Sequence, residues 1–305
     1  MRSQIIVGYT DTEGGRDALE LALTLAEADD GRAALTVASI WPVNPHEMVQ
    51  PGVHIAYERA LAADAESRLQ GARDHCGDRE DVSFVARGGT SPAHGLQLIA
   101  QELGAELIVV GRSHTGPVGR AFVGSVTEQT LHGAACAVAV APKGYAGTEH
   151  RVALVAVAYD GSPESEHALA HALRIARDRG AALRLVRVVE PMPVAYGGMV
   201  DPYPFALRHS DVEDQLHAVV ERIDGVPVTT AMVDGTAAHA LAEQAADADL
   251  LVTGSRDFGP VGRILLGGTS SRLSRHCACP LLVVPRSTAD AVAPALAADA
   301  AVAAP

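Results

Sequence analysis

The sequence has few aromatic residues and little positive charge, and both features limit the fold classes and the ligands that the chain can have. Phe, Trp and Tyr make up only 4% of its 305 residues, whereas hydrophobic residues make up 48%. A core of this composition is built mainly from Ala, Val, Leu and Ile, which suits parallel α/β sheets with strands buried on both faces. A net charge of −13 argues against a nucleic-acid partner and against docking on anionic lipid. A nucleotide stays open as a ligand, because a nest of backbone amides can hold phosphate on an acidic protein.

Long apolar runs and cysteines at zinc-site spacing are also missing. No run approaches the roughly 18 apolar residues of a transmembrane helix, and the first ten residues, MRSQIIVGYT, lack the apolar stretch of a signal peptide. We therefore expect a cytoplasmic protein without a membrane partner. Of the four cysteines, Cys277 and Cys279 have one residue between them, which is not the spacing of common zinc sites. We expect reduced thiols near the ends of helices and strands.

An internal repeat divides the chain in two. Residues 105–142 align with residues 248–285 without a gap, at an offset of 143, and both segments contain GPVGR. Residues 5–19 align with residues 155–169 at an offset of 150. Two copies of one domain agree with the size that the chain length suggests. The predicted divisions are a first domain over 1–143, a linker over 144–150, a second domain over 151–286 and a disordered tail over 287–305.

Strand and helix patterns alternate in each half. In the second half, Ser162 is a predicted helix N-cap, Pro163 takes the first helical position and Gly180 ends the helix. This alternation indicates βαβ units with right-handed crossovers, so we expect an α/β fold with a five-stranded, doubly wound, Rossmann-like parallel sheet in each half. The expected later elements of the second half are strands at 183–189, 226–233, 250–253 and 281–284 and helices at 211–223, 237–247 and 269–277.

Ligands of an open α/β sheet bind beyond the carboxyl ends of the strands, at the switch point in strand order. Two segments converge there in each half. One is the turn after the first strand, which contains Thr10 and Asp11 in the first half and Asp160 in the second. The other is a glycine-rich loop after the fourth strand. Ile40 and Val188 end the second strands, where they are positioned to flank a base.

The glycine-rich loop of the first half offers several groups to a phosphate. Gly111 and Gly124 let the backbone approach an anion closely, and Ser125 and Thr127 supply hydroxyls. A helix that starts near Ser125 presents free amides, and Arg120 is placed to add a charge-assisted contact. The loop has no Gly-Lys pair, so it is not a P-loop. From spacing alone, a second interpretation stays open, in which the glycines only turn the chain and Ser125 only caps the helix.

These segments resemble the universal stress protein family, over residues 3–143 and 151–286. Members typically carry G-x-x-G, nine residues, then G-[ST] and one more Ser or Thr. An Asp commonly ends their first strand, and Cys-Pro with an aliphatic run forms the fifth. Asp160 matches the Asp, and Cys279 with Pro280 opens a matching fifth strand. The resemblance implies a doubly wound sheet of strand order 3-2-1-4-5.

The resemblance also implies how the fifth strands and the ligand site are used. In a tandem chain the halves can pair through 138–141 and 281–284 about a pseudo-twofold axis, and a homodimer through the fifth strand is the other arrangement. Members that bind ATP use the strand-1 Asp, a backbone group near the end of strand 2 and the glycine-rich loop. Other members bind no nucleotide and act as adaptors.

Both halves depart from the family pattern. In the first, Thr10 stands at the position of the Asp, and His114 replaces the second loop glycine. In the second, Asp257 places negative charge where a phosphate would pass, and Gly268 replaces the Ser or Thr, although Ser270 keeps the later hydroxyl. The first half thus has the better phosphate loop, and we predict that it binds nucleotide more tightly. Asp160 and Asp257 could both approach the second pocket, where two carboxylates could hold Mg²⁺ or do acid–base work.

Three functions follow from these patterns. The leading one is a nucleotide-binding module of the ATP class in stress response or signalling, with no enzymatic activity. The second is a scaffold without nucleotide that works through the sheet edge and the aromatic loops 41–57 and 190–209. The third is a weak ATP hydrolase, for which no catalytic motif is visible. The expected nucleotide-binding residues are Thr10, Asp11, Ile40, Gly111, His114, Arg120, Gly124, Ser125, Val126, Thr127, Asp160, Val188, Gly254, Asp257, Gly267, Gly268 and Ser270.

Overall fold

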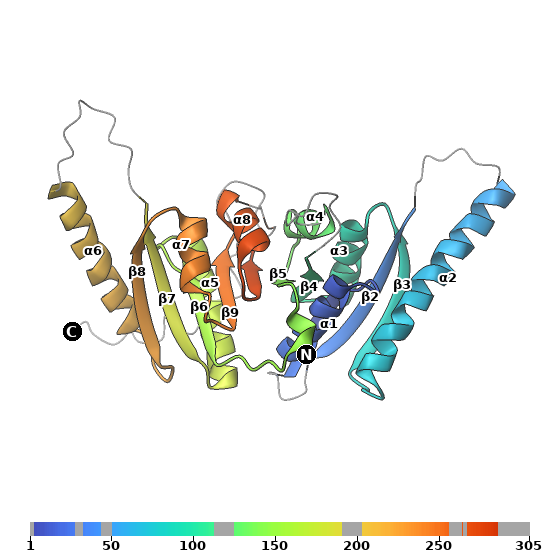
Figure 1. Cartoon of the computed structure of the whole chain (residues 1–305), viewed down its shortest axis with the longest axis horizontal. Helices are drawn as coiled ribbons and strands as arrows, with labels where there is room; N and C mark the ends of the chain where they lie inside the picture. Colours follow the sequence, from blue (N-terminus) through green and yellow to red (C-terminus); the bar gives the residue numbers. More distant parts are fainter. Residues whose placement is uncertain are drawn as a thin grey trace, which may run out of the picture.

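The computed structural model describes residues 3–27, 33–43, 51–112, 125–190, 203–255, 264 and 267–285, with the backbone alone at 51–54, 125 and 203–208. The tail predicted over 287–305 lies outside the described residues. Strands and helices alternate along both halves (Figure 1). Among the helices described, none has the length and apolar character needed to cross a membrane.

The elements of the first half are β1 (Gln4–Gly8), α1 (Glu13–Ala26), β2 (Ala34–Pro42), α2 (Pro51–Cys76), β3 (Val82–Gly89), α3 (Pro92–Leu103), β4 (Leu107–Gly111), α4 (Ser125–Leu131) and β5 (Ala137–Ala141). A short 3-10 helix, η2 (Tyr145–Gly147), leads to the second half. The elements there are β6 (Leu154–Ala158), α5 (Pro163–Arg179), β7 (Ala182–Val189), α6 (Tyr203–Val220), β8 (Val228–Asp234), α7 (Ala237–Gln244), β9 (Leu250–Gly254), α8 (Gly268–His276) and β10 (Leu281–Val284).

The strands of both halves join in a single ten-stranded sheet of order β3-β2-β1-β4-β5-β10-β9-β6-β7-β8. Each half therefore has the order 3-2-1-4-5 with parallel neighbours, which confirms the expected fold class. β5 and β10 pair antiparallel at the centre, with Leu282 opposite Ala139, as the resemblance implied. Because these two strands have neighbours on both sides, neither keeps a free edge, and a homodimer would have to use a different surface.

The central strands are apolar on both sides, and this fixes the layers of the fold. Along β4, Ile108 and Val109 are fully buried on opposite faces of the sheet, since side chains alternate along a strand. The core cluster that contains Val109 also contains Val157 of the second half, and the cluster that contains Ile108 also contains Leu251. Both cores therefore continue through the seam, by which we mean the contact between the two halves along β5 and β10.

The first helix of the second half begins and ends as predicted. The side chain of Ser162 accepts from the amide of Ser165 at 3.2 Å, with Pro163 in the first turn. Gly180 closes the helix at φ 63°, the left-handed conformation that glycine adopts without strain. These short-range signals act within one turn, so the sequence alone is enough to read them.

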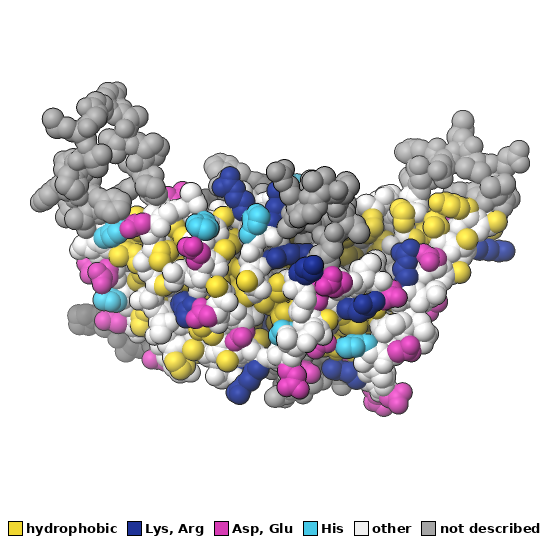
Figure 2. Space-filling model, in the orientation of Figure 1, with side chains coloured by type: hydrophobic (Ala, Val, Ile, Leu, Met, Phe, Trp, Pro, Cys, Tyr) yellow, Lys and Arg dark blue, Asp and Glu magenta, His cyan; other side chains and the backbone are white. Residues whose placement is uncertain are grey.

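The loops predicted over 41–57 and 190–209 are partly helical. α6 begins at Tyr203 and not near 211, and α2 begins at Pro51, so Tyr57 lies in a helix and not in a loop. Among the described side chains of α2, the buried ones fall in its second part, whereas Ile55 and Tyr57 are 51% and 54% exposed. Figure 2 shows hydrophobic side chains at the surface over this helix. From Ile55 to Asp64 the helix thus buries no apolar stripe, so hydrophobic periodicity does not detect this part.

The segment predicted as a linker is packed against the first helix. Tyr145 is buried, and the carboxylate of Asp17 in α1, itself only 1% exposed, accepts from the amides of Gly144 at 3.0 Å and Ala146 at 2.9 Å. The ring of Tyr145 stacks on His150 with centroids 3.5 Å apart. The entry to the second half is therefore held by a buried charge-assisted contact.

Replacing Asp17 with alanine should lower the free energy of unfolding by about 2–4 kcal/mol, because two buried amides lose their acceptor. Urea unfolding followed by circular dichroism measures this change. The control is Glu27→Ala, at the exposed end of the same helix, for which we expect less than about 0.5 kcal/mol. Equal changes in the two variants would contradict a structural role for Asp17.

Further hydrogen bonds cross the seam. Ile264, which follows β9, exchanges two backbone hydrogen bonds with the turn before β5: it accepts from Gly133 at 2.8 Å and donates to Ala134 at 2.8 Å. Arg179 at the end of α5 donates to the carbonyl of Leu25 in α1 at 3.1 Å. The two halves are therefore joined by side chains and loops as well as by the sheet.

Candidate functional site

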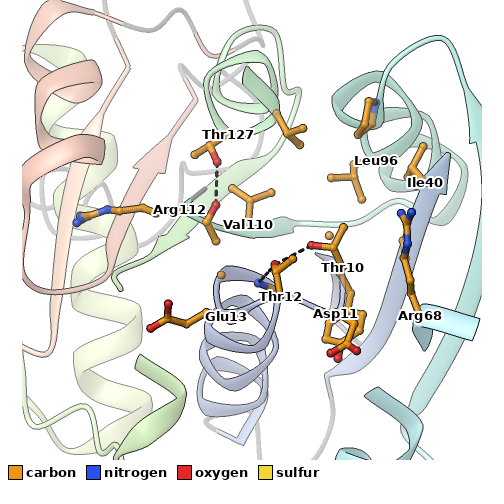
Figure 3. A pocket seen from close by; sticks show the side chains of 18 of the residues that line it. Thr10, Asp11, Thr12, Glu13, Ile40, Arg68, Leu96, Val110, Arg112 and Thr127 are labelled. Atoms are coloured by element: carbon orange, nitrogen blue, oxygen red, sulfur yellow. Dashed lines mark hydrogen bonds between the residues drawn. The ribbon is translucent and has the colours of Figure 1, made fainter. Parts of the chain in front are cut away.

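Each half has a cavity at the carboxyl edge of its strands. The first cavity has a volume of about 770 Å³ and lies between the ends of β1, β2 and β4 and the helices α1, α2, α3 and α4 (Figure 3). The second has a volume of about 730 Å³ and lies between the matching elements β6, β7, β9, α5, α6, α7 and α8. Both occupy the place where an open α/β sheet binds its ligands.

The structure brings many of the expected residues together, in two sets. The first cavity is lined by Thr10, Asp11, Ile40, Gly111, Val126 and Thr127 among others. The second is lined by Asp160, Val188, Gly254, Gly267 and Ser270 among others. Gly268 begins α8 and does not line the second cavity. His114, Arg120, Gly124 and Asp257 lie outside the described residues, and of Ser125 the backbone alone is described.

The first cavity has one apolar wall. Ala38 and Ile40 of β2, Leu96 of α3 and Val110 of β4 supply aliphatic surface to it. Figure 3 shows Ile40 and Leu96 on the side of the cavity away from Glu13. Arg68 of α2 also lines the cavity, so a cationic side chain is part of the same wall as the aliphatic residues. Such a wall suits a flat apolar ring system, with the polar atoms of a ligand toward Thr10.

The turn after β1 is held by its own hydroxyls. The oxygens of Thr10 and Thr12 lie 3.0 Å apart, and Thr12 also accepts from the amide of Gly15 at 3.2 Å, capping α1. Asp11 pairs instead with Arg16 at 2.9 Å, and both side chains are more than half exposed. Asp11 lines the first cavity with a carboxylate that Arg16 already engages, and its part in ligand binding stays a prediction.

Thr127 was expected to offer its hydroxyl to a phosphate, but it ties two elements together. Its oxygen donates to the carbonyl of Gly111 at 2.8 Å, and the residue is only 2% exposed (Figure 3). Gly111 in turn approaches Gly14 so closely that a Cβ atom on Gly111 would lie 1.8 Å from the carbonyl oxygen of Gly14. In this arrangement both residues position α4 and α1 against the end of β4.

The second cavity contains an ionised carboxylate at the end of its first strand. Asp160 accepts from the amide of Ser162 at 3.0 Å and from the hydroxyl of the same residue. Burial raises the pKa of this carboxyl, but the hydrogen bonds from Ser162 outweigh burial, and the pKa is lowered overall. Arg187 on β7 contributes in the same direction. Asp160 is therefore an anion at neutral pH.

Sequence reasoning missed several polar groups of the second cavity. Thr253 and Ser255 line it with hydroxyls that have no hydrogen-bond partner among the described residues, and they are 4% and 2% exposed. The matching residues of the first half are Val110 and Arg112, at the offset of 143. Glu164, also buried in this wall, stands where the first half has a glycine. A position-by-position comparison of the repeats could have found these differences.

The two cavities also differ in charge. Among the described residues, the second cavity is lined by four carboxylates and one arginine: Asp160, Glu164, Glu190, Asp211 and Arg187. The first has two carboxylates and two arginines in its wall. Within the part of the chain that the structure describes, no three His, Cys, Asp or Glu side chains are grouped to hold a metal ion. The partner expected for Asp160 at a Mg²⁺ site, Asp257, is outside that part.

The sequence and the fold are similar to those of known proteins. The sequence model of the universal stress protein family matches residues 1–142 and 154–285. The chain is 28% identical to a universal stress protein of Mycobacterium tuberculosis over 292 aligned residues. The alignment covers 92% of this chain and 99% of the relative. A universal stress protein of Archaeoglobus fulgidus has a similar solved structure, with a TM-score of 0.64 at 18% identity, covering 94% of this chain and 98% of that one. A shorter universal stress protein, solved in complex with cAMP, covers 45% of this chain at 26% identity and a TM-score of 0.32.

Proposed function

Since the chain belongs to the universal stress protein family, we propose that its first half binds an adenine nucleotide of the ATP class and that the chain acts as a nucleotide-dependent module in stress response or signalling. The observation that carries this proposal is the first cavity. Its volume of about 770 Å³ is in the usual range of small-molecule sites. Its aliphatic wall at Ile40 and Leu96 suits an adenine, and its other end meets α4, where the glycine-rich loop ends.

Charge supports the first cavity over the second. A nucleotide carries its negative charge on the phosphates, and like charges in a partly enclosed site repel. Among the described residues, the second cavity presents Asp160, Glu164, Glu190 and Asp211, whereas the first has two carboxylates and includes Arg68, which also pairs with Asp64. We therefore expect the first half to bind more tightly, although the family carboxylate Asp160 belongs to the second.

The first measurement is the nucleotide that the protein carries when purified. We expect denaturation of fresh protein to release about one adenine nucleotide per chain, identified by chromatography. Calorimetric titration of ATP, ADP, AMP and cAMP into the stripped protein, with and without Mg²⁺, then ranks the ligands. No released nucleotide and no heat at millimolar concentrations would overturn the proposal.

A matched pair of variants tests which half binds. Gly124 and Gly267 occupy the same position of the repeat, and Gly267 has φ −75°, which valine also adopts. We expect Gly124→Val to weaken nucleotide binding at least tenfold, about 1.4 kcal/mol, and Gly267→Val to change it less than about threefold. The reverse pattern, with both variants folded by circular dichroism, would assign the site to the second half.

An adaptor without nucleotide is the second candidate. The exposed apolar side chains of α2, Ile55 and Tyr57, favour it, because such side chains are a common feature of protein contacts. A weak hydrolase is the third candidate. Steady ATP turnover that the Gly124→Val variant abolishes would support it and would contradict our expectation that the chain is not an enzyme.

A further inference from the structure

Two thiols of the second half lie in contact at the seam. Cys277 follows the last turn of α8, Cys279 precedes β10, and their sulfur atoms are 3.3 Å apart. The two side chains are 0% and 5% exposed, but Ala278 between them is exposed, so the pair lies just below the surface. A small shift of the side chains would bring the sulfur atoms to bonding distance, which is about 2 Å.

A cation of the first half faces this pair. Arg112 follows β4, and its guanidinium donates to the carbonyl of Cys277 across the seam. Figure 3 shows its side chain leaving the first cavity toward the second half. Its Nε atom is buried without a hydrogen-bond partner among the described residues. Burial lowers the pKa of Arg112, but an arginine stays charged at neutral pH, so the thiols face a poorly solvated positive charge.

The two thiols are not equivalent. A hydrogen bond from Cys279 opposes the effect of burial and, with Arg112 contributing, lowers the pKa of Cys277 to about 7. The same contact and burial raise the pKa of Cys279. We take Cys277, whose carbonyl accepts from Arg112, as the attacking thiolate and Cys279 as the thiol that donates to it.

The first half offers a built-in control. Cys136 occupies the repeat position of Cys279, but Ala134 stands at the position of Cys277, so no second thiol is adjacent in the sequence. Burial raises the pKa of Cys136 to about 12. The thiol pair and its low-pKa member are thus features of the second half alone among these matched positions.

We propose that Cys277 and Cys279 form a peroxide-sensitive dithiol that closes to a disulfide at the seam, with Arg112 of the first half as the residue that activates Cys277. The thiolate of Cys277 attacks one oxygen of hydrogen peroxide: an S–O bond forms, the O–O bond breaks, and the departing hydroxide takes a proton to become water. The sulfur of Cys279 then attacks the sulfenic acid, the S–O bond breaks, and hydroxide leaves with the proton of Cys279 as a second water. Two thiols are oxidised, and one peroxide is reduced to two waters.

Neither cysteine lines either cavity, although Arg112 also lines the first. Its place in the fold couples it to the pairing of the halves, because the carbonyl of Cys277 accepts from Arg112 and β10 pairs with β5 from Leu281 onward. Arg112 is in this reaction a positioning and electrostatic residue. Oxidation of the two thiols would therefore change the contacts that join the two halves.

The test uses the full chain, reduced and freed of reductant, then treated with hydrogen peroxide and quenched with iodoacetamide at timed intervals. Intact mass and peptide mapping should show loss of two hydrogens and a Cys277–Cys279 disulfide within one chain. We expect this reaction to be at least tenfold faster than oxidation of Cys136. A folded protein in which Cys277 stays reduced, or reacts no faster than Cys136, overturns the proposal.

Variants assign the roles. In Cys279→Ser, a cyclic 1,3-diketone should capture a sulfenic acid at Cys277, and in Cys277→Ser no disulfide should form within the chain. Arg112→Met should slow disulfide formation about tenfold, Arg112→Lys should recover most of the rate, and Cys136→Ser should match the parent. If Arg112→Met, shown folded by circular dichroism, reacts at the parent rate, the activating role of Arg112 is wrong.

Discussion

Replacing Gly111 with alanine should lower the free energy of unfolding by about 3 kcal/mol or more, which is a large effect for the addition of one methyl group. The Cβ atom would lie 1.8 Å from the carbonyl oxygen of Gly14, which is a backbone atom. No side chain can move aside, so β4 or the start of α1 has to shift. Residues of both elements line the first cavity. The hydrogen bond from Thr127 to Gly111 would be disturbed as well.

Two other glycines provide a graded comparison for this prediction. A Cβ atom on Gly254, the matching residue of the second half, would lie 2.5 Å from the carbonyl oxygen of Glu164, so Gly254→Ala should destabilise less than Gly111→Ala. Gly147 has no atom within 4 Å of a Cβ and should tolerate alanine within about 0.5 kcal/mol. Thermal and urea unfolding of the three variants give the order. If Gly111→Ala behaves like Gly147→Ala, the backbone at this contact is not as closely packed as the structure indicates.

The same Gly111 variant connects stability to binding. We expect it to lose nucleotide affinity even at temperatures where it is folded, because residues that line the first cavity are displaced, whereas Gly254→Ala should keep that affinity. Calorimetric titration with ATP at a temperature well below the unfolding midpoint separates the two effects. Equal loss in both variants would indicate a general loosening of the sheet and not a local change in the first cavity.

The fold could be predicted from the sequence because its determinants are repeated and local. Three signals each depend on few neighbouring residues: the aligned segments of the two halves, the helix caps at Ser162 and Gly180, and the aliphatic strand at 281–284. Together with the family resemblance they were enough for the strand order and for the pairing of the fifth strands. The start of α2 was not predicted, because the side chains described from Ile55 to Asp64 bury no apolar stripe and give no periodic signal.

The candidate site was predictable in place but not in detail. That Thr10 and Ile40 share a cavity follows from strand order alone. The partners of individual side chains do not, because they depend on which way each side chain turns in three dimensions. Thr127 donates to a carbonyl, and Arg112, which starts a loop expected to hold phosphate, reaches across the seam to Cys277. Spacing in the sequence contains no information on such long-range choices.

A histidine near the seam provides the second large effect, on the pH dependence of stability. His171 lies on α5, and burial, together with the positive charge of Arg174, lowers its pKa to about 4; His167 acts in the same direction and Glu106 of the first half opposes it. In the unfolded chain a histidine has a pKa of about 6.5. The folded pKa is therefore depressed, so the unfolded state binds the proton more readily. The folded state therefore has its full stability, as far as His171 is concerned, above about pH 6.5. It loses stability relative to the unfolded state as the pH falls from about 6.5 toward 4.

The difference between the folded and unfolded pKa of His171 lowers the free energy of unfolding by roughly 3 kcal/mol over the whole pH range of the titration. Between about pH 7 and pH 4.5 the loss is about 2 kcal/mol. Urea unfolding at these two pH values should therefore show the parent losing about 2 kcal/mol more than His171→Gln, whose side chain does not titrate. The control His217→Gln, on the exposed face of α6, should lose as much as the parent. If His171→Gln and His217→Gln have the same pH dependence, His171 is protonated in the folded chain without cost, and water reaches it at the seam.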